Sequence, residues 1–147
     1  MTSAPAPVPA AADPVPASLR TMFVIHFWAD ICVAVPLFLA PEALLGWLGW
    51  PAVDPLAARL VACALFGIGI ESLLGRNADA GAFRAMLTLK VIWSATAAAG
   101  IAWTILAAPA AAPYPAVAWG FFAIFAGFHG IWLRYLLLMR AAAGPAR

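Results

Sequence analysis

Six side chains that could serve a chemical site lie within otherwise apolar stretches: His26, Asp30, Glu71, Lys90, Trp93 and His129. His26 and Asp30 are four residues apart, so a helix places them on one face, where an imidazole and a carboxylate could exchange a proton. Glu71 and Lys90 carry opposite charges, and each would cost about 2.5–3.5 kcal/mol if it were exposed to hydrocarbon. We therefore expect these two charges to face the protein interior and each other.

This pattern is compatible with functions of three classes. The leading interpretation is a non-enzymatic protein that binds a small ligand, a lipid or a protein partner, with Asp30, Glu71 and Lys90 providing the charge. His26 and His129 would then alter that charge with pH. The second interpretation is a membrane-embedded enzyme acting on an apolar substrate, with His26, Asp30 and Glu71 as the catalytic candidates. The third is a small proton-coupled carrier, which would need a homodimer to build its pathway.

Each candidate also has a purely structural interpretation. Polar groups in membrane helices often do no more than fix which helix faces meet. Glu71 and Lys90 would then form a structural ion pair, and His129 would be an interhelical histidine. Trp93, with Trp28 and Trp132, would be a packing residue rather than a surface on which a ligand stacks.

The sequence predicts no cofactor. It contains no metal-binding motif of the E-x-x-H or C-x-x-C type, so no metal site is predicted. Cys32 and Cys63 both lie in apolar runs, where a thiol behaves as a small hydrophobic group. His26 and His129 could in principle ligate a haem from two helices, but bulky aromatic residues occupy the same depth.

The composition excludes most soluble classes. The chain has 147 residues, of which 66% are hydrophobic and 10% are charged, whereas soluble domains carry roughly 25% charged residues. The net charge of +2 is too small and too dispersed for nucleic-acid binding. We therefore predict an integral membrane protein of one domain, surrounded by lipid, with a small apolar ligand and a second copy of the chain as candidate partners.

Four apolar runs predict an all-α fold with transmembrane helices at about 19–39, 56–74, 83–106 and 117–139. Short connections favour an up-down-up-down four-helix bundle spanning residues 18–140. Pro36 predicts a kink or early stop in the first helix. Residues 40–55 are too short and too rich in Gly and Pro to cross, and Trp47 and Trp50 place them at the headgroup level. Residues 1–17 are expected to be a disordered Ala/Pro-rich tail, and residues 141–147 a short basic tail.

The basic residues predict the orientation. Five of the eight basic residues flank the termini and the second connection: Arg20, Arg76, Arg84, Arg140 and Arg147. The positive-inside rule then places both termini in the cytoplasm of a multi-pass protein, which we expect in a bacterial inner membrane. In this orientation the polar residues gather in the cytoplasmic half and would line a hydrated vestibule open to the cytoplasm, with Asp30 deepest.

Two neighbouring stretches also resemble a known group of proteins. LFLAPEALLGWLGWP, followed by DPLAARLVACALFGIGI, resembles small four-helix membrane proteins of the DoxX-like kind over about residues 37–75. The shared features are a Pro-bounded outer loop and an Arg-Leu opening to a Gly-containing second helix. The resemblance implies the four-helix membrane fold and says little about activity.

Overall fold

The computed structural model describes residues 15–50, 52–109 and 114–142, and every regular element in these ranges is helical. The all-α prediction is confirmed for them. The elements are α1 (Ala17–Leu39), α2 (Pro41–Trp47), α3 (Pro55–Leu74), the 3₁₀ turn η1 (Gly75–Asn77), α4 (Ala80–Ala107) and α5 (Val117–Ala142). The predicted tails lie outside the described residues except at their inner ends, where α1 begins at Ala17 and α5 continues to Ala142.

The helices α1, α3, α4 and α5 are long and apolar enough to cross a membrane, as predicted. Two of them begin at acidic caps that the hydrophobic pattern alone does not reveal. The Asp54 carboxylate accepts hydrogen bonds from the Leu56 and Ala57 amides at 2.9 and 3.2 Å, and Pro55 occupies the first turn of α3. The Asp79 carboxylate accepts from the Ala82 amide at 2.9 Å, so α4 begins three residues before the predicted 83.

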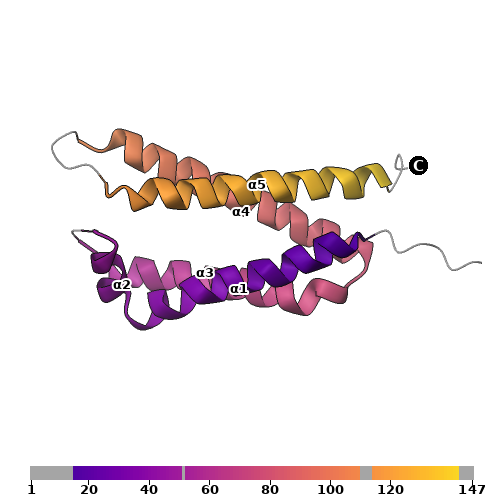
Figure 1. The fold of residues 1–147 in the computed structure, drawn as a ribbon, viewed down its shortest axis with the longest axis horizontal. Coiled ribbons are helices and arrows are strands. Elements are labelled where there is room, and N and C mark those ends of the chain that lie inside the picture. The colour runs from indigo at the N-terminus through magenta and orange to yellow at the C-terminus, as the bar shows by residue number, and fades with distance from the viewer. Residues whose placement is uncertain (1–14, 51, 110–113, 143–147) are drawn as a thin grey trace, which may run out of the picture.

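The segment between α1 and α3 is short and bent. Pro36 lies inside α1, and the helix ends three residues later at Leu39. The seven-residue α2 follows directly and is too short to cross a bilayer. The turn after it contains Gly49 at φ 91°, a left-handed conformation that favours glycine. This segment lies at the end of the molecule opposite the described chain ends (Figure 1).

The four long helices form two layers (Figure 1). The backbones of α1 and α3 pack closely, with α2 beside them, and those of α4 and α5 pack closely in the other layer. Between the layers the backbones are farther apart, so side chains make most of the contact. The fold is therefore better described as two helical hairpins laid against each other than as four equally packed helices.

Buried side chains of α1, α4 and α5 join the two hairpins near the described chain ends, which lie together at one end of the molecule (Figure 1). The Phe23 ring of α1 lies 4.7 Å from the Phe83 ring of α4 and 5.8 Å from the Trp132 ring of α5, measured between centroids. We call this the aromatic core, and it continues through Val15, Leu19, Met86, Leu87, Leu136 and Met139. The expected hydrated vestibule at this end is wrong, because bulky apolar side chains occupy that space.

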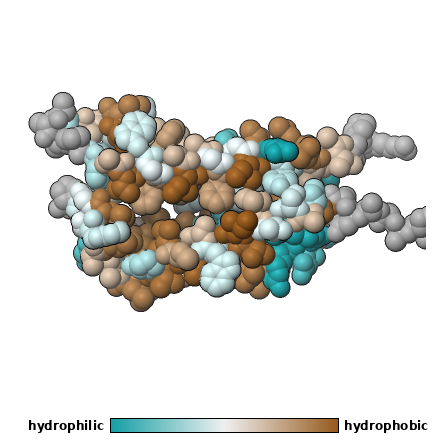
Figure 2. Space-filling view, viewed as in Figure 1, coloured by the Kyte–Doolittle hydropathy of each residue, from teal (hydrophilic) through white to brown (hydrophobic). Residues whose placement is uncertain are grey.

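The outer surface is largely apolar. Large hydrophobic side chains point outward from each long helix, among them Leu39 on α1, Leu74 on α3, Trp103 on α4 and Leu137 on α5. Figure 2 shows hydrophobic residues along both layers, with the strongest hydrophilic patch at the lower right, near the described chain ends. A surface of this kind fits lipid better than water.

Candidate functional site

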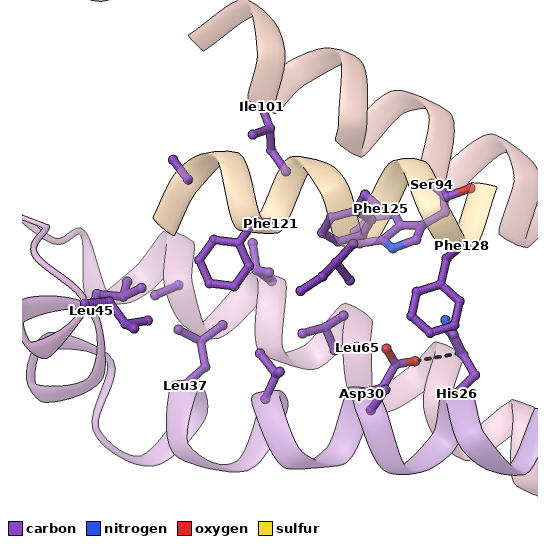
Figure 3. A pocket seen from close by; sticks show the side chains of 18 of the residues that line it. His26, Asp30, Leu37, Leu45, Leu65, Ser94, Ile101, Phe121, Phe125 and Phe128 are labelled. Carbon is purple, nitrogen blue, oxygen red and sulfur yellow. Dashed lines mark ion pairs between the residues drawn. The ribbon is translucent and has the colours of Figure 1, made fainter. Parts of the chain in front are cut away.

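The two hairpins separate toward the α2 end and leave a cleft of about 470 Å³ between them. Figure 2 shows the surface hollowed there, between the two layers. We call this space the inter-layer cleft. Most of its wall is apolar, and Leu37 of α1, Leu45 of α2, Leu65 of α3, Ile101 of α4 and Phe121 of α5 point into it (Figure 3).

The inner end of the inter-layer cleft is polar. It is formed by His26 and Asp30 of α1 together with Lys90 and Ser94 of α4, and we call these four residues the polar end. All four are buried: Lys90 is 3% exposed and Asp30 is 8% exposed. The polar end adjoins the aromatic core, because His26 packs edge-on against Phe128 and Trp132 with centroids 4.9 and 5.0 Å apart.

Lys90 is surrounded by partners. Its Nζ donates to Ser72 Oγ at 2.6 Å and lies 3.2 Å from His26 Nδ1. The same atom sits 5.0 Å from the Phe23 ring centre and 5.3 Å from that of Trp132, within cation–π range. The Ser72 hydroxyl in turn donates a hydrogen bond to the Ile68 carbonyl at 2.6 Å. An ammonium at this position therefore has two polar acceptors and two aromatic faces.

This arrangement leaves Asp30 without a donor. Its Oδ2 lies 3.1 Å from His26 Nδ1, as the helical spacing of four predicts (Figure 3). An ammonium can only donate, so Nδ1 accepts from Lys90 and has no proton to offer the carboxylate. Within the described part of the chain, Asp30 Oδ2 is buried and has no hydrogen-bond partner. A buried carboxylate oxygen of this kind is costly unless something else donates to it.

The expected pairing of Glu71 with Lys90 is wrong. Glu71 is exposed on α3, and no Glu71–Lys90 ion pair within 4.0 Å occurs among the described residues. The neighbouring Ser72 takes its place, because one step along a helix turns the side chain by about 100°. Glu71 does not line the inter-layer cleft in the described ranges and lies outside the polar end.

The remaining candidates divide between the cleft and the helix packing. Trp93 lines the inter-layer cleft beside Lys90 and Ser94. His129 Nδ1 lies 3.2 Å from the Val91 carbonyl and 3.2 Å from Ser94 Oγ, so it joins α5 to α4 within one hairpin. A carbonyl only accepts, which assigns the proton of His129 to Nδ1. His129 is thus an interhelical histidine, as its structural interpretation predicted, and it is not among the described residues that line the cleft.

No family model, curated protein or solved structure matches this chain. The resemblance of residues 37–75 to DoxX-like proteins therefore stays an expectation. Among the residues that the structure describes, no group of three His, Cys, Asp or Glu side chains could hold a metal ion.

Sequence reasoning missed the residues that complete the site. Ser72 lies in the second apolar run and Ser94 in the third. Ser94 follows Lys90 by four residues, a spacing that places Ser94 and Lys90 on one helix face. That spacing was an available signal. The leucines of α2, which close the far end of the inter-layer cleft, gave no such signal, because only the tertiary fold brings them there.

Proposed function

We propose that this chain is an integral membrane protein that binds a small, largely apolar ligand in the inter-layer cleft. In this proposal α1, α3, α4 and α5 cross a cell membrane up-down-up-down, and both termini face the cytoplasm. The apolar outer surface and the four long apolar helices support the embedding. The basic residues near η1, Arg76 and Arg84, support the orientation.

The observation that carries the proposal is the size and wall of the inter-layer cleft. At about 470 Å³ it falls within the range of sites for small molecules, which is about 300–1,000 Å³. The inter-layer cleft is open at its rim, and an apolar molecule that enters it gains van der Waals contact with the apolar wall. An apolar occupant is therefore favoured over an empty cleft.

The polar end supports a ligand site over mere helix packing. A polar group with a structural role finds its hydrogen-bond partner within the protein, as Ser72 and His129 do. Asp30 does not, because its buried Oδ2 has no partner in the described residues and the side chain faces the inter-layer cleft. A carboxylate that lines a cavity and receives no hydrogen bond from the described residues is typical of a site that a ligand completes.

A membrane-embedded enzyme is the second candidate. The approach of Asp30 Oδ2 to within 3.1 Å of His26 Nδ1 favours it, because a substrate proton could be shared between the two. Binding without chemistry is the better-supported function, since Lys90 already occupies the basic atom of His26. Recovery of a chemically altered ligand after incubation with the purified protein would favour the enzyme instead.

Filling the inter-layer cleft tests the proposed function. Ala29 lines the cleft, whereas Ala123 is exposed on α5 and is absent from its described lining. We expect protein purified in mild detergent to retain a small apolar molecule, visible by native mass spectrometry, that Ala29→Phe loses and Ala123→Phe keeps. Equal retention by both folded variants would contradict a ligand site in the cleft.

A further inference from the structure

We propose that the ligand is an uncharged amphiphile with one apolar chain and a hydroxyl head, and that the hydroxyl donates its hydrogen bond to Asp30. This inference rests on the proposed function and names the class of ligand. It also assigns the ligand's direction, with the head at the polar end and the chain toward α2.

The Asp30 carboxylate requires a hydrogen-bond donor from the ligand. Asp30 is 8% exposed, its carboxylate accepts no hydrogen bond from the described residues, and the side chain lines the inter-layer cleft. A carboxylate only accepts hydrogen bonds, so the group that completes it must carry a proton on oxygen or nitrogen. An ether or a hydrocarbon would leave the carboxylate without a donor and would forgo the bond.

The charges at the polar end select a neutral head. Lys90 already places one ammonium near Asp30 and is held by Ser72, His26 and two aromatic rings. A bound amine would add a second cation to one carboxylate in a region of low dielectric. A fatty acid or a phosphate would place an anion against Asp30, while the Lys90 donors are already engaged. A hydroxyl satisfies Asp30 and adds no charge.

The wall of the inter-layer cleft beyond Asp30 indicates that the ligand carries an apolar chain. From Asp30 to Leu37 the cleft follows α1 for about 10 Å, at about 1.5 Å per residue, and then continues beside Leu44 and Leu45 of α2. The side chains along this path are aliphatic or aromatic, with Phe121 and Phe125 above it (Figure 3). A single flexible chain fits this shape.

The rim of the inter-layer cleft indicates the route of entry. Val33, Val61 and Ile124 line the cleft and are also exposed, at 40%, 45% and 55%. These rim residues are apolar and belong to α1, α3 and α5. In a bilayer such a rim faces lipid tails, so the ligand enters sideways from the membrane rather than from water.

A matched series of ligands tests the head group without any mutation. Decanol, decyl methyl ether, decylamine and decanoic acid share one chain length and differ at the head. Their affinities for the purified protein are measured by native mass spectrometry in mild detergent. We expect decanol to bind at least about tenfold more tightly than the methyl ether, which is the value of one hydrogen bond to a charged acceptor. We also expect decanol to bind more tightly than the amine and the acid.

Variants at Asp30 assign the preference to this residue. Asp30→Asn keeps an acceptor oxygen and should keep much of the preference for decanol over its ether. Asp30→Leu removes the acceptor and should reduce the preference to about twofold or less. A preference that survives Asp30→Leu would overturn the assignment, and so would equal affinity of the alcohol and the ether for the wild-type protein.

The two proposals fail in different ways. If Ala29→Phe abolishes binding of both decanol and its ether but the wild type does not distinguish them, the cleft binds ligands and the hydroxyl head is wrong. Tighter binding of decylamine or decanoic acid would likewise reject the neutral head. If none of the four compounds binds, or if Ala29→Phe binds them as the wild type does, the proposed function fails as well.

Discussion

Gly69 of α3 lies directly against Asp30 of α1. A Cβ atom at Gly69 would be 2.8 Å from Asp30 Cβ, closer than real Cβ contacts allow, and 3.2 Å from its Oδ2, which is a tight contact. The missing side chain therefore lets the two helices approach at the depth of the polar end, as small residues do in membrane helices. Asp30 thus contacts Gly69 of α3 on one side and borders the inter-layer cleft on another.

Gly69→Ala is expected to destabilise the protein by about 1–3 kcal/mol, the usual cost of overpacking. The nearest atom is a Cβ close to the α1 backbone, so it cannot move without the helix. Gly67→Ala is the matched control, because a Cβ there meets nothing within 4 Å. The control should be neutral or stabilising by up to about 1 kcal/mol. Thermal unfolding in detergent makes the comparison, and equal effects at both glycines would show that the contact does not constrain α1.

Lys90 should couple energetically more strongly to Ser72 than to Glu71. Lys90 Nζ donates to Ser72 Oγ at 2.6 Å, whereas Glu71 is exposed. Ser72→Ala should cost about 1.5–3 kcal/mol while Lys90 is present and much less beside Lys90→Met. The coupling between Glu71→Gln and Lys90→Met should be smaller than that between Ser72→Ala and Lys90→Met. Double-mutant cycles on unfolding in detergent check both pairs; a strong Glu71–Lys90 coupling would restore the ion pair that the sequence suggested.

Trp132 should be the most sensitive tryptophan of the chain. It is 1% exposed and joins the hairpins through Phe23, whereas Trp103 is 78% exposed. Trp132→Ala should cost about 3–5 kcal/mol, because it opens a cavity in the aromatic core. Trp103→Ala, which changes only an outward face, should cost far less. The measurement is again unfolding in detergent, and similar losses at both positions would mean that the aromatic core does not join the hairpins.

The orientation is testable with single cysteines. In a background of Cys32→Ala and Cys63→Ala, Glu42→Cys in α2 and Asn77→Cys in η1 lie at opposite ends of the fold and are both exposed. We expect a membrane-impermeant maleimide to label Glu42→Cys on intact cells and Asn77→Cys only after permeabilisation. The reverse pattern would place both termini outside and would contradict the orientation derived from the basic residues.

The sequence by itself determined the helices. Runs of apolar residues long enough to span a bilayer are a local property, so the spans could be read to within about three residues at each end. The proximity of His26 and Asp30 was also local, because four residues along a helix bring two side chains to one face. The free-energy cost of exposing a charge to hydrocarbon further predicted that Lys90 is buried, and the structure buries it.

Only the tertiary structure decided what these elements build. Lys90 meets His26 and Ser72 across 64 and 18 residues of sequence, and the rotation of α3 about its axis chose Ser72 over the adjacent Glu71. The position of the inter-layer cleft depends on where the two hairpins touch: Phe23, Phe83 and Trp132 fill one end, and the hairpins separate toward the other. Hydropathy carries no information about such contacts, because outside the polar end the side chains that fill or border the gap are all apolar. The faces that meet between helices fix both the site and the direction in which it opens.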